Sequence, residues 1–104
     1  MDLFKKVDND LLVVIKDYLG CAYTQNERLQ NAIKFVIPPI QTGSDYSTNV
    51  AMVFSKALGK KPFDIANELC EKIKVLNFVQ EANAINGYIN ITFKPQIWEH
   101  FLAD

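Results

Sequence analysis

The residues with the clearest capacity for chemistry are Tyr88 and Asn90, which one residue separates near the C-terminal end of the chain. They follow Asn86-Gly87, a pair that favours a tight hairpin turn. Residues two apart on a strand share a face, so an aromatic ring and an amide are expected side by side. A ring can stack on a nucleobase and an amide can hydrogen-bond its edge. The spacing predicts a binding face, with the alternative that Tyr88 only covers Ile85.

A two-residue turn at Asn86-Gly87 also predicts the register of the hairpin. On one face it pairs Ile85 with Tyr88, Asn83 with Asn90, and Glu81 with Thr92; on the other it pairs Ala84 with Ile89, and Ala82 with Ile91. The first face is mostly polar and the second apolar, and a slip of one residue would destroy this sorting. Asparagine is disfavoured inside strands. The facing Asn83 and Asn90 therefore form a polar patch that the stability of the sheet does not require.

The strand that precedes the turn is expected to begin near Val75, where the hydrophobic period changes to two. Strict alternation from there places Phe78, Gln80, Ala82 and Ala84 on the apolar face. It places Val79 with Glu81, Asn83 and Ile85 on the polar face.

Signals for enzyme chemistry or metal binding are weak, and we predict no catalytic residue and no metal site. His100 is the single histidine and lies four residues from the end, where a surface position is expected. The chain contains no G-x-S-x-G sequence, no glycine-rich phosphate loop and no His-Glu-x-x-His. Cys21 and Cys70 are far apart and are expected to be small apolar residues, Cys70 on the apolar stripe of a helix.

Three lysines, Lys56, Lys60 and Lys61, gather where one predicted helix ends and the next begins. They can be a solvated helix end, with cations near the negative end of the helix dipole. They can also contact phosphates. The spacing by itself favours the first interpretation.

Bulk composition predicts a single globular domain that spans residues 1–104. Hydrophobic residues make up 49% and charged residues 22% of the sequence, and the formal net charge is −1. This charge argues against a free-standing nucleic-acid binder, since such modules usually carry a strong basic field. No apolar run approaches a membrane span, and early charges at Asp2, Lys5 and Lys6 argue against a signal peptide. We expect a cytosolic protein.

Periodicity predicts four helices and three strands. The helices are expected at 3–18, 45–58, 62–73 and 96–103, and the strands at 34–37, from about 75 to 85, and 88–93, with 21–31 ambiguous. Gly20 and Gly59 suit helix ends, and Pro62 suits a first helical turn. The second helix is expected to start in the 45–48 cluster with Tyr46 on its buried stripe, together with Val50, Val53, Phe54, Ala57 and Leu58. The third is expected to bury Phe63, Ala66, Leu69, Cys70 and Ile73, and the last Trp98.

This order predicts an α+β fold. The expected architecture is a two-layer sandwich, in which a small, mainly antiparallel sheet is covered by helices on one face.

Four segments in order, residues 45–52 (DYSTNVAM), 56–62 (KALGKKP), 65–69 (IANEL) and 87–91 (GYINI), resemble the N-terminal additional domain of arginyl-tRNA synthetase. The resemblance covers roughly residues 3–102. The His-Ile-Gly-His and Lys-Met-Ser-Lys-Ser signatures of class I synthetases do not occur in the chain. The catalytic and anticodon-binding domains are thus expected to be absent and the chain to be a piece of the enzyme.

The resemblance implies a two-layer α+β domain that docks on the outer corner of arginine tRNA, where the D-loop lies. It implies that Tyr88 stacks on a D-loop base and that Asn90 hydrogen-bonds the edge of that base, with Asn83, Asn86, Lys60 and Lys61 as further tRNA contacts. The parent enzyme would be an arginine–tRNA ligase that uses ATP and Mg in its catalytic domain. This piece would have no activity and no cofactor, would be a monomer without membrane contact, and would have tRNA and the other synthetase domains as partners.

Two positions depart from the family pattern. Asn86 stands where relatives often have proline, so the turn can differ and Asn86 can itself reach the base. Ser44 stands where relatives often have glycine, and Gly43 can supply the unusual backbone conformation instead. The alternative function is a protein-interaction or docking module without nucleic-acid contact, and a stand-alone enzyme has almost no supporting residues.

Overall fold

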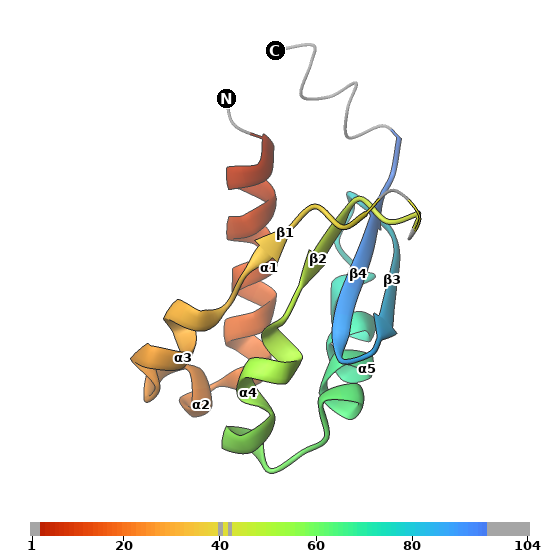
Figure 1. Ribbon diagram of the computed structural model, residues 1–104. Helices are drawn as coiled ribbons and strands as arrows, with labels where there is room; N and C mark the ends of the chain where they lie inside the picture. Colours follow the sequence, from red (N-terminus) through yellow and green to blue (C-terminus); the bar gives the residue numbers. More distant parts are fainter. Residues whose placement is uncertain (1–2, 40, 42, 96–104) are drawn as a thin grey trace.

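The computed structural model describes residues 3–39, 41 and 43–95, without the side chains of residues 3 and 4. The elements are α1 (Leu3–Leu19), α2 (Cys21–Thr24), α3 (Glu27–Ala32), β1 (Phe35–Val36), β2 (Tyr46–Thr48), α4 (Val50–Leu58), α5 (Pro62–Ile73), β3 (Val79–Ile85) and β4 (Tyr88–Phe93) (Figure 1). The helix expected at 96–103, with Trp98 and His100, lies outside the described residues.

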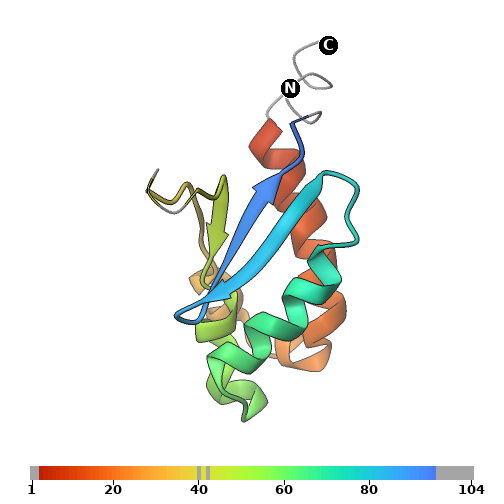
Figure 2. The ribbon, with the colours of Figure 1, turned by 90° about the vertical axis from the view of Figure 1, so that its right-hand side faces the viewer.

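The four strands form one antiparallel sheet in the order β1-β2-β4-β3. Helices α1 and α5 lie together on one side of this sheet (Figure 2). The predicted two-layer α+β architecture is therefore confirmed. Within the described ranges, no helix is long and apolar enough to cross a membrane.

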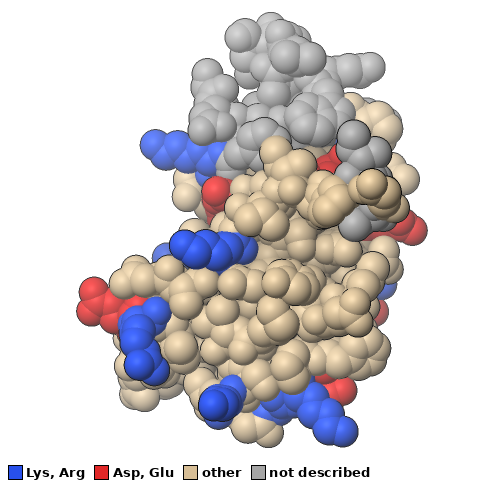
Figure 3. Space-filling model, in the orientation of Figure 1, with Lys and Arg blue, Asp and Glu red and all other residues tan. Residues whose placement is uncertain are grey.

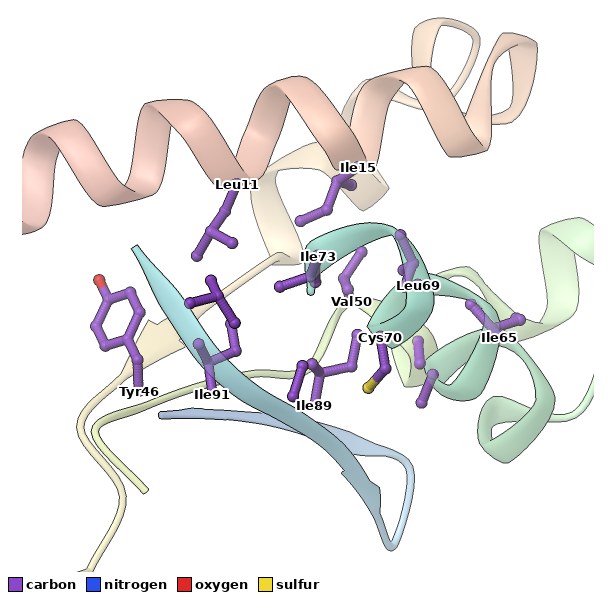
Figure 4. Close-up of a cluster of buried hydrophobic side chains, with 14 of the residues drawn as sticks. Leu11, Ile15, Tyr46, Val50, Ile65, Leu69, Cys70, Ile73, Ile89 and Ile91 are labelled. Carbon is purple, nitrogen blue, oxygen red and sulfur yellow. The ribbon is translucent and has the colours of Figure 1, made fainter. Parts of the chain in front are cut away.

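The core lies between the helices and the apolar face of the sheet (Figure 4). α1 contributes Leu11 and Ile15, and β4 contributes Ile89 and Ile91, all fully buried. A fully buried aliphatic side chain of this size contributes about 1.5–3 kcal/mol of hydrophobic stabilisation. The predicted helix from residue 3 and its end before Gly20 are confirmed, because the three- and four-residue spacing in α1 matches the helical period.

The prediction that residues 45–48 begin a helix is wrong. Tyr46–Thr48 form β2, which pairs with Ile89–Ile91 of β4 on one side and with β1 on the other. The Tyr46 hydroxyl donates a hydrogen bond to Asp8 Oδ1 of α1, and the backbone N–H of Phe93 donates to Asp45 Oδ2 at 2.9 Å. These contacts come from distant parts of the chain, and they override the local capping preference.

α4 starts only at Val50, after Asn49. The Asn49 side chain makes no capping bond; it accepts from the Lys34 N–H at 2.8 Å and donates to the Ala32 carbonyl at 3.2 Å. The ambiguous segment after Gly20 is mostly helical, as α2 and α3.

The buried faces of α4 and α5 are rotated slightly from the faces that the sequence predicts. In α5 the fully buried residues are Ile65, Ala66, Leu69 and Ile73, whereas Phe63 is 54% exposed. In α4 Ala51 is buried and Ala57 is exposed. Phe63 lies about a quarter turn from the centre of the buried stripe, because successive residues advance by about 100°.

The prediction that Val79 lies on the polar face is also wrong. Val79 is buried and pairs with the buried Phe93, whereas Glu81 pairs with Thr92, so β3 has one extra residue at Gln80. Such a bulge moves Val79, the one residue of β3 before it, to the opposite face. β3 begins at Val79 and not, as the sequence predicts, near Val75. Val75 lies in the turn before the strand and is 80% exposed.

Candidate functional site

The β3–β4 hairpin has the turn and the register that the sequence predicts. Asn86 has a φ of 51° and Gly87 a φ of 82°, as a type I′ turn requires at both central positions. All five predicted pairs occur, from Ile85 with Tyr88 to Glu81 with Thr92. Tyr88 and Asn90 therefore lie on the face opposite to Ile89 and Ile91, which point into the core.

We call this surface the open face; it consists of Val36, Ser47, Glu81, Asn83, Ile85, Tyr88, Asn90 and Thr92. In the register of the sheet, four of these residues form one row across all strands: Val36, Ser47, Asn90 and Asn83. Neither Val36 nor Ser47 is predicted as a site residue. The local sequence around Ser47 favours the start of a helix, and its pairing with Asn90 joins residues 43 positions apart, so no local pattern indicates it.

Tyr88 stands at the hairpin end of the open face, and its side chain is 41% exposed. Its cross-strand partner Ile85 is 46% exposed. A tyrosine whose role was to cover Ile85 would leave that side chain buried. The exposure of both residues favours a ring that is available to a ligand.

Asn90 is far less accessible, with 7% of its surface exposed. It belongs to β4, which has β2 on one side and β3 on the other, so neighbouring side chains enclose it. Its Oδ1 accepts a hydrogen bond from the Ser47 hydroxyl at 2.8 Å. Asn83, its partner on β3, is exposed at the edge of the sheet.

The hairpin tip lies against the starts of both α4 and α5. A Cβ atom placed on Gly87 would come within 2.9 Å of Met52 Cγ and 3.3 Å of Pro62 Cβ. Asn86, beside Gly87, is exposed. The lysines that precede Pro62 are thus brought to the same end of the molecule as Tyr88.

The two predicted lysine contacts differ in their surroundings. Lys60 Nζ forms an ion pair with Glu68, at 3.1 and 3.0 Å from the two carboxylate oxygens. This hydrogen bond raises the pKa of Lys60 and lowers the pKa of Glu68. Lys61 is exposed and has no ion-pair partner within the described part of the chain. Lys61 is the better placed of the two for a phosphate.

Most of the middle of the open face is uncharged. In Figure 3, which views the molecule as in Figure 1, most of the surface over β2, β4 and β3 is uncharged. Lys and Arg side chains gather at the left and lower margins of this face. An uncharged centre with cations at its margin suits a base contact flanked by phosphates.

The acidic, histidine and cysteine side chains of the described residues form no metal-binding cluster. Among residues 3–39, 41 and 43–95, no group of three His, Cys, Asp or Glu side chains is close enough to hold a metal ion. Cys70 is buried in the core, and burial raises the pKa of its thiol to about 11. A neutral, enclosed thiol is a poor nucleophile.

Comparison with known proteins identifies the family. The family model described as arginyl tRNA synthetase N terminal domain matches residues 9–93. An arginine–tRNA ligase of Pelagibacter ubique is 37% identical over 106 residues, which is 98% of this chain and 18% of that relative. An arginine–tRNA ligase of Methanocaldococcus jannaschii is 46% identical over 55 residues, 51% of this chain and 10% of that relative.

A solved structure has the same fold. It is an arginyl-tRNA synthetase of Thermus thermophilus, with a TM-score of 0.58 and 24% identity, covering 86% of this chain and 16% of that one. The chain therefore spans less than a fifth of the length of these relatives. With the family model matching most of its residues and with the fold in agreement, the chain belongs to the arginyl-tRNA synthetase N-terminal domain family.

Proposed function

We propose that this chain is a tRNA-recognition module of an arginine–tRNA ligase and that its open face contacts the D-loop at the outer corner of arginine tRNA. Tyr88 stacks on an unpaired D-loop base, and Asn90 hydrogen-bonds the edge of that base. Asn83 and Asn86 flank the base, and Lys61 contacts a neighbouring phosphate, with a smaller contribution from Lys60. The chain itself catalyses no reaction and needs no cofactor.

The whole protein, in this proposal, is a monomeric cytoplasmic enzyme that joins arginine to its tRNA. ATP and Mg bind in its catalytic domain, and the open face supports the reaction by orienting the tRNA. The other synthetase domains are the module's second partner.

The observation that carries the proposal is the exposed Tyr88 ring at a hairpin end, on the same strand face as Asn90, in a member of this family. An exposed aromatic ring stacks on any base, since every base has a π-face, and an amide beside it adds selectivity for the base edge. Stacking on one aromatic residue contributes about 1–3 kcal/mol.

Titration of the isotope-labelled chain with an arginine tRNA transcript, followed by NMR at low salt, tests the proposal and detects weak binding. We expect resonances of the hairpin to shift. Tyr88→Ala should raise Kd roughly five- to hundredfold, as the loss of one stacked base implies. Tyr88→Phe, which keeps the ring, should bind almost as well as the original chain.

Val13→Ala is the matched control, because Val13 is an exposed apolar residue (66%) on α1, in the opposite layer. It should leave Kd unchanged. The proposal would be wrong if the tRNA shifted no hairpin resonance, or if Tyr88→Ala bound as tightly as Val13→Ala.

A second candidate function is docking onto another protein surface. It is favoured by the exposed apolar side chains of Met52 (39%), Ile85 (46%) and Tyr88 (41%), with Met52 packed near the hairpin tip at Gly87. A dry apolar interface of this kind would bind independently of salt, whereas tRNA binding weakens as salt rises.

A further inference from the structure

The hydrogen bond between Ser47 and Asn90 joins two buried polar side chains on the open face. Ser47 is 4% and Asn90 is 7% exposed, and the two residues are direct partners across the β2–β4 ladder. The Ser47 Oγ–H donates to Asn90 Oδ1 at 2.8 Å. The bond satisfies the Ser47 hydroxyl hydrogen and Asn90 Oδ1 where water has little access.

This bond determines which end of the Asn90 amide faces a ligand. Oδ1 is directed to β2, where Ser47 lies, so Nδ2 is directed away from β2. Among the described residues Nδ2 has no acceptor, and it is not one of the fully buried atoms that lack a partner. Nδ2 therefore reaches the surface with its N–H groups available.

We propose that Ser47 is a positioning residue that holds Asn90 as a hydrogen-bond donor toward its ligand. The ligand group that Asn90 recognises is then a hydrogen-bond acceptor, a ring nitrogen or a carbonyl oxygen on the edge of an unpaired base. This inference rests on the proposed tRNA contact, and it adds that Asn90 is the donor and the base the acceptor in the hydrogen bond between them. Without Ser47, the amide can rotate and present Oδ1 instead, which would favour a different base edge.

Stability of the sheet alone does not account for the pair. The strongly β-forming Thr, Val and Ile make good cross-strand pairs and need no mutual hydrogen bond. In this sheet the buried serine and asparagine lie in the same row as the exposed Asn83, close to the exposed Tyr88. A polar pair beside an accessible ring is expected where orientation of a polar group matters.

Three substitutions in the chain separate orientation from folding, with an arginine tRNA transcript as the probe. Ser47→Ala removes the donor and should raise Kd roughly three- to tenfold, the value of one ordinary hydrogen bond. Ser47→Thr keeps a hydroxyl and should restore binding. Asn90→Asp keeps the acceptor for Ser47 but removes the Nδ2 donors, and it should weaken binding at least as much as Ser47→Ala.

Asn90→Asp also adds a negative charge, and Gln80→Glu is the matched control for that charge. Gln80 is exposed at the bulge of β3, in the same sheet, so its substitution should weaken binding much less. If Ser47→Ala does not fold, Ser47→Cys, with a weak donor of similar size, should give an intermediate Kd.

A direct readout does not depend on tRNA. The side-chain amide resonances of Asn90 in the free chain should move in Ser47→Ala and return in Ser47→Thr. Suppose that Asn90→Asp and Tyr88→Ala weaken tRNA binding, whereas Ser47→Ala (or Ser47→Cys) binds tRNA as tightly as the original chain. That result would overturn the role of Ser47 and leave the tRNA contact intact. Unchanged binding of both Tyr88→Ala and Asn90→Asp would instead overturn the tRNA contact itself.

Discussion

Tyr88 and Asn90 share a face of β4, yet the surrounding residues give them different properties. Tyr88, at the strand end, is 41% exposed, whereas Asn90, between β2 and β3, is 7% exposed and bonded to Ser47. The same contrast holds for the lysines, since Lys60 is paired with Glu68 and Lys61 is not paired within the described residues. The type of a residue determines which interactions its side chain can make. The neighbouring residues determine which of its atoms remain free to contact a ligand.

The two cysteines should differ sharply in reactivity. Cys21 is exposed, whereas Cys70 is 4% exposed with its thiol pKa raised to about 11 by burial. The thiolate is the reactive form of cysteine, and at pH 8 only about 0.1% of the Cys70 side chains are thiolates. Burial also keeps reagents away from this thiol. Titration of the folded chain with a disulfide reagent should show one fast thiol. Cys21→Ser should abolish the fast phase, and two fast thiols in the native chain would contradict the buried position of Cys70.

Among the elements, those with strong local signals form where the sequence predicts them. Asn86-Gly87 forms the hairpin turn, Gly59 ends α4 with a φ of 64°, and Pro62 starts α5. β2 is different, because its residues favour a helix start locally and a strand only when β4 and β1 lie beside them. A three-residue strand has little stability of its own, so tertiary pairing decides its conformation.

Gly87 and Gly59 provide a matched test of the contact between the hairpin and the helices. Both have positive φ, so Gly→Ala at either should cost about 1–2 kcal/mol of unfolding free energy. Gly59 has no atom within 4 Å of an added Cβ, whereas Gly87 has Met52 Cγ at 2.9 Å. We expect urea denaturation to show about 1 kcal/mol of additional loss for Gly87→Ala, within the range for overpacking.

Met52→Ala should remove that additional loss when it is combined with Gly87→Ala, since residues in contact couple in a double-mutant cycle. Equal losses at Gly59 and Gly87, or a strictly additive double variant, would show that the tip does not pack against α4.

In the molecule as a whole, the residues that stabilise the fold and the residues proposed to bind a ligand lie on opposite faces of the sheet. The helices and the apolar sheet face form the core, and the open face is left without a helix within the described residues. The net charge is only −1, so the domain has no general attraction for polyanions. Binding should depend on a few cations at the margin together with the base contact.

Salt dependence tests this picture. Two phosphate contacts imply that Kd for arginine tRNA rises roughly sevenfold between about 50 and about 200 mM salt, at about 0.7 released counterions per contact with single strands. Lys61→Ala should reduce the slope by about 0.7. Lys60→Ala should reduce it less, because Glu68 already pairs with Lys60. A Kd that does not change with salt would favour the protein-docking function instead.

Local sequence determined α1, the C-terminal end of α4, both ends of α5, the β3–β4 turn and the pairing of Asn83 with Asn90. Each of these follows from residues within one or two turns of one another, whose backbone preferences and periodicity agree. Tertiary structure alone decided that Tyr46–Thr48 form a strand, that the bulge at Gln80 returns Val79 to the core, and that Ser47 lies against Asn90. These depend on contacts between segments far apart in the chain, and short strands gain their stability only from such contacts.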